Sequence, residues 1–184
     1  MNKSSHHSMT MIQSDSNNMH MLTFWSRSKH PDHRYLSNFE SVPGGVRIHD
    51  DFFILYMRGR TFPSIENAFQ ACKYAFSDNP SCMTALETCS PKEAKSAGSK
   101  TGMKKKKTTL DVKLWNKMSY ECMSELLNIR YHSDERFKRI IDDARSEGKT
   151  FGHIETRGSY LWGGCMKNGQ WVGENRLGKI MNDL

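Results

Sequence analysis

One segment in the first half of the chain carries an apolar stripe at helical spacing. Its members are Ile65, Phe69, Cys72 and Phe76. Residues that recur at such intervals lie on one face of a helix, and that face must be buried against other elements. Ser64 immediately precedes the stripe and is of the type that caps a first turn. The sequence therefore predicts a packed helix at this point.

Other helical patterns follow towards the C-terminus. The further predicted helices cover residues 80–88, a segment opened by Ser90-Pro91, 114–130, 134–148 and a closing segment from Asn175. Strand-type residues are confined to 46–62, where we expect two short strands or a hairpin, and to 151–155. The predicted fold is mainly α: a single compact helical domain of five to six helices with a small β-hairpin element.

Length and composition set the domain organisation and the compartment. A chain of 184 residues fits one domain. We expect a disordered tail over residues 1–20, which are polar and lack periodicity, and a folded domain over 21–184. No apolar run approaches the length of about 18–20 residues that spans a bilayer, and no secretory signal is apparent. Five scattered cysteines without a CxxC pair favour a reducing compartment and no metal site, so we expect a soluble protein of the cytoplasm or nucleus.

Positive charge is concentrated in one stretch of the chain. Residues 91–117 hold nine lysines against Glu93 and Asp111, a net charge of +7 (nine minus two) that equals the net charge of the whole chain. Within it, Lys104, Lys105, Lys106 and Lys107 form an unbroken run in a segment that we interpret as an exposed loop. Two interpretations stay open: a solvated loop, or an electrostatic contact for phosphates or nucleic acid.

Polar residues accompany the apolar stripe of the helix predicted after Ser64. Successive residues turn by about 100° on a helix, so Glu66, Gln70 and Lys73 share a second stripe beside the buried one. A carboxylate, an amide and an amine on one stripe could form a catalytic group. The alternative is structural: Glu66 could simply favour the positive end of the helix dipole, and Lys73 could lie on the surface.

A glycine-rich segment near the C-terminus is the second candidate site. Trp162 offers a stacking face next to Gly163 and Gly164, where a backbone without side chains permits close approach to a ligand. The alternative is a tight turn beside a core tryptophan. Asn175 could likewise cap the last helix.

Together these segments resemble the NADAR family in order and spacing over about residues 22–184. The matching motifs are Phe24-Trp25-Ser26, Tyr35-Leu36-Ser37-Asn38-Phe39, residues 63–73, Ser90-Pro91-Lys92-Glu93-Ala94-Lys95, Trp115 with the helix of Met118 and Met123, Trp162-Gly163, and Gly173-Glu174-Asn175-Arg176-Leu177-Gly178.

This resemblance implies an intracellular hydrolase that cleaves an N-glycosidic bond to ribose, without a cofactor. It implies Glu66 and Lys73 as catalytic residues, with Lys73 able to trap the opened sugar as a Schiff base. The residues it implies for substrate binding are Ser26, Tyr35, Asn38, Phe39, Gln70, Lys95, Trp115, Trp162, Gly163 and Asn175. One position departs from the pattern: Ser159 stands where family members often carry an aspartate. Either Glu155 supplies the acidic group, or this chain does without it.

The resemblance leaves three functions to separate. Removal of ADP-ribose from guanine in nucleic acid is the one that the lysine-rich stretch favours, because its partner would be a polyanion. The second is cleavage of ribosylated pyrimidine phosphate intermediates of flavin metabolism. The third is a non-catalytic module that binds ADP-ribose or a similar small molecule.

Overall fold

The computed structural model describes residues 20–184 of the chain. The tail predicted over residues 1–20 lies, except for His20, outside the described residues. Within the described part, no helix is both long and apolar enough to cross a membrane.

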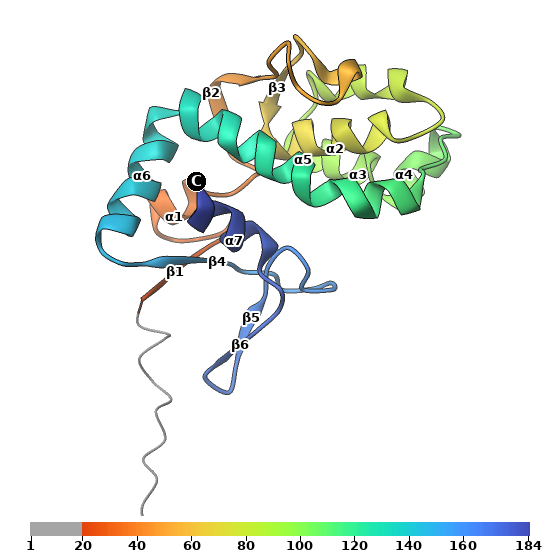
Figure 1. The fold of residues 1–184 in the computed structure, drawn as a ribbon. Coiled ribbons are helices and arrows are strands. Elements are labelled where there is room, and N and C mark those ends of the chain that lie inside the picture. Colours follow the sequence, from red (N-terminus) through yellow and green to blue (C-terminus); the bar gives the residue numbers. More distant parts are fainter. Residues whose placement is uncertain (1–19) are drawn as a thin grey trace, which may run out of the picture.

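Helices dominate the fold (Figure 1), which confirms the predicted mainly α class. The α-helices are α1 (Pro31–Tyr35), α2 (Ile65–Ala75), α3 (Pro91–Ala97), α4 (Lys100–Lys105), α5 (Val112–Ser133), α6 (Glu135–Ser146) and α7 (Arg176–Asp183). Two 3-10 helices are η1 (Leu55–Met57) and η2 (Pro80–Leu86). The strands are β1 (Met21–Phe24), β2 (Ser41–Arg47), β3 (Thr61–Ser64), β4 (Thr150–His153), β5 (Cys165–Lys167) and β6 (Gln170–Val172).

Helix α2 is the centre of the helical part, and it begins where the sequence predicts. The Ser64 hydroxyl accepts a hydrogen bond from the backbone N–H of Asn67 at 3.2 Å, which caps the first turn. Its neighbours are α3, α5 and η2. Helix α3 starts with a capping box in which Ser90 and Glu93 exchange hydrogen bonds. The first cap fixes where α2 and its polar stripe start, and the second fixes where α3 starts beside it.

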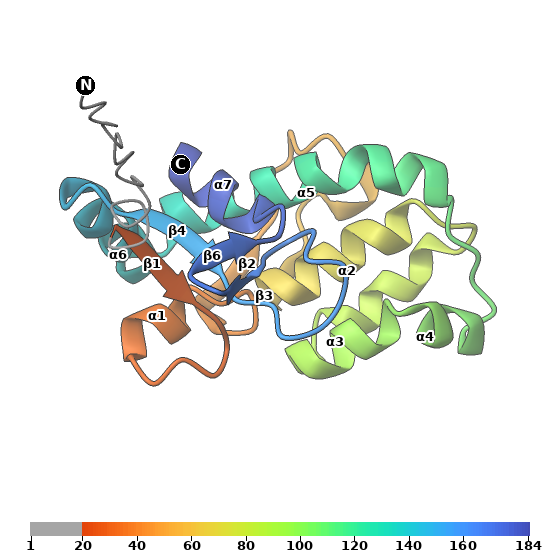
Figure 2. The same ribbon diagram turned by 90° about the horizontal axis from the view of Figure 1, so that it is seen from below.

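A parallel strand pair joins the start of the described residues to the segment that follows α6. Strand β1 pairs with β4, and Phe24 lies opposite His153. Because parallel strands leave a sheet at the same edge, the loop after β1 and the segment after β4 emerge side by side. Figure 2 shows this pair at one end of the molecule, with α2, α3 and α4 at the other. Helix α7 packs on β4 and also meets α5.

A fully buried ion pair connects α5, α6 and the chain after α1. Arg130 is 0% exposed and donates to the Asp134 carboxylate at 3.2 Å and to the carbonyl oxygens of Tyr35 and Ser37 at 2.8 and 3.2 Å. The Tyr35 hydroxyl donates to both oxygens of Asp134 at 3.0 Å. Asp134 also accepts from the backbone N–H of Phe137 and thereby caps α6. These bonds fix the segment that leads from α1 into the next loop.

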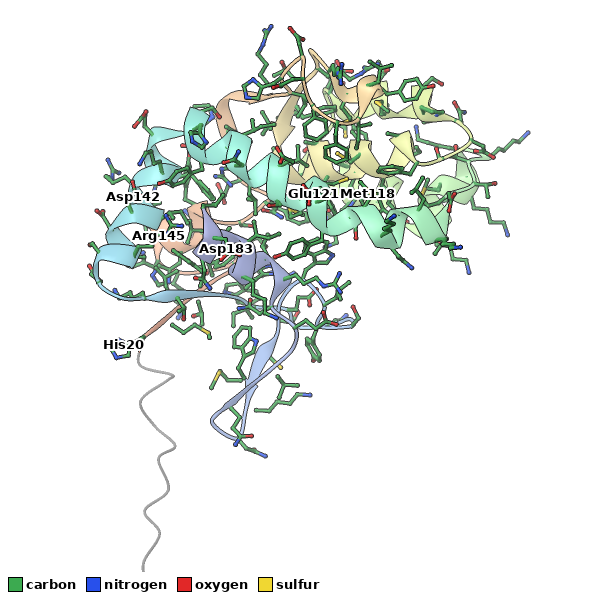
Figure 3. All side chains as sticks on the ribbon, in the orientation of Figure 1. His20, Met118, Glu121, Asp142, Arg145 and Asp183 are labelled. Atoms are coloured by element: carbon green, nitrogen blue, oxygen red, sulfur yellow. The ribbon has the colours of Figure 1, made fainter. Side chains whose placement is uncertain are left out.

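The C-terminal helix is held against α6 near the end of the chain. Arg145 of α6 donates to the carbonyl oxygen of Asn182 at 3.0 Å, and Figure 3 shows Arg145 beside Asp183. This contact joins α6 to α7 in the half of the molecule away from α3 and α4 (Figure 2).

The structure corrects four local predictions. The strands expected within 46–62 are misplaced: β2 and β3 pair as a hairpin, but they overlap this range only at its two ends, at residues 46–47 and 61–62. Between them the N–H of Gly59 donates to the carbonyl of Ile48, and residues 49–58, with the apolar residues 52–56, form a loop that contains η1. Residues 80–86 form a 3-10 helix instead of an α-helix. Helices α1 and α4 are too short to carry an apolar periodicity that would predict them. Two of the four consecutive lysines lie in α4, so this run is not simply a loop.

Candidate active site

A cavity of about 850 Å³ opens where α2, α3 and α5 meet the ends of β1 and β4. This volume suits a ligand of nucleotide size. Nine of the residues proposed from the sequence line it: Ser26, Asn38, Phe39, Glu66, Gln70, Lys73, Lys95, Trp115 and Trp162. The strand pair and the helices therefore bring together motifs that lie far apart in the sequence.

The polar stripe of α2 faces this cavity. Glu66 is 7% exposed and Gln70 is 9% exposed, and the Gln70 amide donates to the Glu66 carboxylate at 3.0 Å. One turn further along, the Lys73 amine donates to the carbonyl oxygen of Gly98 at 2.6 Å. The backbone N–H of Glu66 donates to the carbonyl of Asn38 at 2.9 Å, which ties the start of α2 to the loop before β2. Carboxylate, amide and amine are thus each held by a neighbour.

Burial shifts both charged groups towards their neutral forms. It raises the pKa of Glu66, against the opposing influence of Lys95, the hydrogen bond from Gln70 and the charge of Lys73. It lowers the pKa of Lys73, against the attraction of Glu66. A carboxyl group and an amine that can each change protonation state are suited to proton transfer and to nucleophilic chemistry.

Aromatic side chains form one wall of the cavity. Phe69 of α2 lies between two tryptophans, with ring centroids 5.0 Å from Trp115 and 5.3 Å from Trp162. The Lys73 amine lies 6.0 Å from the centre of the Trp115 ring. Both tryptophans are partly exposed and so keep surface for a planar ligand.

Basic side chains gather along another part of the lining. Arg27, Lys92, Lys95 and Arg157 all line the cavity, and within residues 20–184 none of them forms an ion pair. The Lys95 amine lies over the Phe39 ring at 5.1 Å. Against these cations the lining offers only two carboxylates, Glu66 and Glu155. The cavity is thus suited to an anionic ligand.

Three buried polar atoms of the lining lack a hydrogen-bond partner in the described part of the chain: Asn38 Oδ1, Gln70 Oε1 and His153 Nδ1. Burial, reinforced by repulsion from Lys95, lowers the pKa of His153 to about 4, although a backbone contact with Trp162 opposes the shift. The imidazole is therefore neutral at pH 7. Buried polar groups without partners are uncommon in folded proteins, and here all three belong to residues that line the cavity.

The remaining proposed residues lie elsewhere. Tyr35 belongs to the buried ion pair of Arg130, and its hydroxyl points to Asp134. The Asn175 amide bridges the backbones of Phe151 and His153, at 2.8 and 3.0 Å, and makes no side-chain cap for α7. Gly163 donates its N–H to Glu155. The exposed lysines 104–107 are not part of the lining either.

Sequence reasoning missed several lining residues. His153 and Arg27 are the main ones, and neither belongs to a periodic pattern. The pairing of β1 with β4 brings them to the cavity, and no local signal in the sequence reveals that pairing. Of the two alternatives for the acidic group, the structure places Glu155 in the lining and leaves Ser159 exposed outside it.

The described residues contain no group of three or more His, Cys, Asp or Glu side chains arranged to hold a metal ion.

Comparison with known proteins gives two results. No curated protein sequence matches the chain. The family model of the NADAR domain matches residues 23–184, which is nearly the whole described part and includes every wall of the cavity. The members of this family are generally N-glycosidases. The chain belongs to the NADAR family.

Proposed function

We propose that the chain hydrolyses the N-glycosidic bond that links ADP-ribose to guanine in nucleic acid. The observation that carries the proposal is the polar stripe of α2, which presents a buried carboxylate and a desolvated amine to one cavity of nucleotide size. Glu66 and Lys73 are the proposed catalytic residues.

Cleavage of such a bond passes through a ribose carbon with cationic character. The ionised Glu66 carboxylate stabilises that cation and orients a water molecule towards it. The hydroxyl group of water bonds to ribose C1, while the guanine nitrogen leaves with the bonding electrons and takes up a proton. The hydrogen bond from Gln70 supports the ionised form of Glu66, which burial alone would disfavour.

Lys73 provides a second route through a covalent intermediate. Opening of the ribose ring while guanine is still attached gives an imine between C1 and the guanine nitrogen. The unprotonated Lys73 amine adds to C1 and displaces guanine, which leaves with its amino group, so that C1 and Lys73 are joined in a Schiff base. A water molecule then hydrolyses this Schiff base to ADP-ribose and the free lysine. The lowered pKa of Lys73 supports this step, because only the free amine is nucleophilic.

The charge of the lining supports a substrate with phosphate groups. Arg27, Lys92, Lys95 and Arg157 offer cations that no carboxylate of the described residues neutralises. The planar faces of Trp115 and Trp162 suit a base or an adenine ring. The lysine-rich stretch 91–117 favours nucleic acid as the carrier of the modified guanine.

Incubation with a DNA oligonucleotide that carries ADP-ribosylated guanine tests the proposal. We expect release of free ADP-ribose and unmodified oligonucleotide, detected by mass spectrometry, and no release by the Glu66→Gln variant. Binding of free ADP-ribose without release from the oligonucleotide would indicate a binding module. Turnover of a ribosylaminopyrimidine phosphate alone would assign the chain to flavin metabolism.

Borohydride separates the two catalytic routes. Reduction during turnover converts a Schiff base into a stable amine, so we expect an added sugar mass on the peptide that contains Lys73. Lys73→Ala serves as the control and should yield no adduct. An active Lys73→Arg variant would contradict the covalent route, because a guanidinium cannot become a free amine.

A further inference from the structure

Helix α3 ends against the polar stripe of α2, and Gly98 is the residue at that end. The last carbonyl groups of a helix lack partners within the helix and need donors from outside. Two α2 side chains supply them: the Tyr74 hydroxyl donates to the carbonyl of Ala97 at 2.9 Å, and the Lys73 amine donates to the carbonyl of Gly98 at 2.6 Å. Gly98 therefore contacts one of the two proposed catalytic groups directly.

The space beside Gly98 is occupied by a second member of the stripe. A methyl group built on Gly98 would lie 2.7 Å from Cδ of Gln70 and closer still to its Oε1. Carbon atoms in contact are normally about 3.5–4.0 Å apart, so Gln70 could not stay where it is. The same Gln70 amide donates to Glu66. The absence of a side chain at residue 98 is thus a condition for the hydrogen bond that Glu66 receives.

Backbone conformation does not explain a glycine at this point. Gly98 has φ of −78° and ψ of 0°, a conformation that is allowed for residues with side chains and needs no glycine. What excludes a side chain is the end of the Gln70 side chain, which is flexible. Alanine at residue 98 would accordingly move Gln70 and leave the fold in place, unlike alanine at Gly102, where a methyl group would meet the backbone of Ser96 and Ala97.

We propose that Gly98 is a positioning residue for the proposed N-glycosidase site: its missing side chain leaves room for the Gln70 amide to hold Glu66, and its carbonyl oxygen anchors the Lys73 amine. Gly98 touches no reacting atom itself. It sets the relative placement of the two groups from one point at the end of α3. This inference rests on the proposed function.

Three variants test it: Gly98→Ala, Gln70→Ala and the double variant. Each single variant removes the hydrogen bond from Gln70 to Glu66, so kcat/KM should fall about tenfold or more, as expected for one hydrogen bond to a charged group. In the Gln70→Ala background the added methyl group no longer meets Cδ or Oε1, and only the Cβ of residue 70 stays near it, at 3.3 Å, a contact that a shift of a few tenths of an ångström relieves. The second substitution should then change kcat/KM by less than about twofold, because the two changes act through one hydrogen bond. Independent, multiplying losses would overturn the proposal.

The ionisation of Glu66 gives a readout that needs no substrate. Because the hydrogen bond from Gln70 lowers the pKa of Glu66, its loss should move the carboxyl titration to higher pH in Gly98→Ala and in Gln70→Ala alike. Carbon NMR of glutamate-labelled protein can follow this titration, with Glu66→Gln identifying the signal. An unchanged titration in Gly98→Ala would overturn the proposal even if the wild-type protein cleaves no N-glycoside.

Folding is tested by the same set of proteins. If Gly98→Ala fails to fold because of the collision with Gln70, the double variant should melt like Gln70→Ala. A double variant that remains unfolded would show that residue 98 meets something other than Gln70, and would contradict the proposal.

Discussion

Two buried clusters of charged residues lie in this fold, and they differ in how completely their polar atoms are paired. Around Arg130, the guanidinium group, the Asp134 carboxylate and the Tyr35 hydroxyl satisfy one another and three backbone groups. Around Glu66, the lining of the cavity leaves buried atoms of Asn38 and Gln70 without partners among the described residues. Both clusters bury charged groups. Only the cluster around Arg130 leaves no buried side-chain polar atom without a partner among the described residues.

The difference separates a structural role from a functional one. Breaking a paired buried ion leaves an uncompensated charge, so such a pair keeps the elements that it joins in one arrangement. Unpaired buried groups destabilise a fold, so unpaired residues in the lining of a cavity indicate a role in binding a ligand. The two clusters are also in contact, because Arg130 donates to the carbonyl of Ser37, next to Asn38. The buried ion pair therefore holds the segment that forms one wall of the cavity.

The largest effect is expected from Arg130→Ala. It leaves the Asp134 carboxylate buried without its cation, so the free energy of unfolding should fall by about 3–5 kcal/mol, as measured by chemical denaturation. Arg136→Ala is a matched control, because Arg136 also pairs with an aspartate, Asp32, but at a side-chain exposure of 43%. The control should lose no more than about 1 kcal/mol. Similar losses for both would break the distinction between the clusters.

Glu66→Gln, in contrast to Arg130→Ala, should reduce turnover and leave the stability of the fold intact. We expect turnover of the modified oligonucleotide to fall about a thousandfold, near 4 kcal/mol of barrier, because the cationic sugar loses its carboxylate. The melting temperature should stay the same or rise, since burial already disfavours the ionised form that wild-type Glu66 must carry. A variant that retained more than about a tenth of kcat would remove Glu66 from the mechanism.

The stripe of Glu66, Gln70 and Lys73 is the part of the site that the sequence predicts best. Its geometry follows from the turn of a single helix, and the cap at Ser64 fixes where that helix starts. Local spacing therefore decides which residues share a face. The fold class is predictable for the same reason, because most helices carry their own apolar periodicity.

The other walls depend on contacts that local sequence does not encode. His153 reaches the cavity through the parallel pairing of β4 with β1, across a separation of more than a hundred residues. Tyr35, which the family resemblance assigns to substrate binding, is turned towards Asp134 by the ion pair of a distant helix. The apolar residues 52–56 resemble a strand, but they lie in a loop because the ladder of β2 and β3 ends at Ile48 and Gly59.

The pH dependence of stability tests whether the buried, unpaired His153 in the cavity lining destabilises the fold. The imidazole of His153 takes up a proton at a pKa of about 4 in the folded protein and near 6.5 in the unfolded chain. Between these values the unfolded state binds more protons, so stability falls as pH decreases from 6.5 to 4, by about 3 kcal/mol at most. Above pH 6.5 this contribution does not change.

Chemical denaturation at pH 7 and pH 4 can isolate that contribution. His153→Gln should lose less stability than the wild-type protein over this range, because other titrating groups are common to both. Replacing the exposed His132 by Gln provides the matched control and should follow the wild-type protein. If His153→Gln lost as much stability between pH 7 and pH 4 as the wild-type protein, the burial of His153 in the cavity lining would not destabilise the fold.

The smallest effect is expected from Lys104 to Lys107, which belong to neither cluster. They are exposed and lie outside the lining, with the first two in the last turn of α4. Exposed cations act on a polyanion through released counterions, so replacing all four by serine should weaken binding to the modified oligonucleotide and flatten its salt dependence. The slope should decrease by about 0.7–0.9 for each phosphate that the lysines neutralise in the wild-type complex. Cleavage of a small ADP-ribosylated nucleoside should stay unchanged, because it needs only the cavity.

Exposed cations on other elements provide the control for this lysine run. Replacing Arg139 and Lys179, which lie on α6 and α7, should leave the salt dependence of binding unaltered. If binding of the modified oligonucleotide had the same salt dependence in the wild-type protein and the fourfold variant, the lysine run would be a solvated surface segment without a role in binding. Slower cleavage of the small nucleoside by the fourfold variant would show that exposed charge also reaches the catalytic step, and that burial alone does not mark the functional groups.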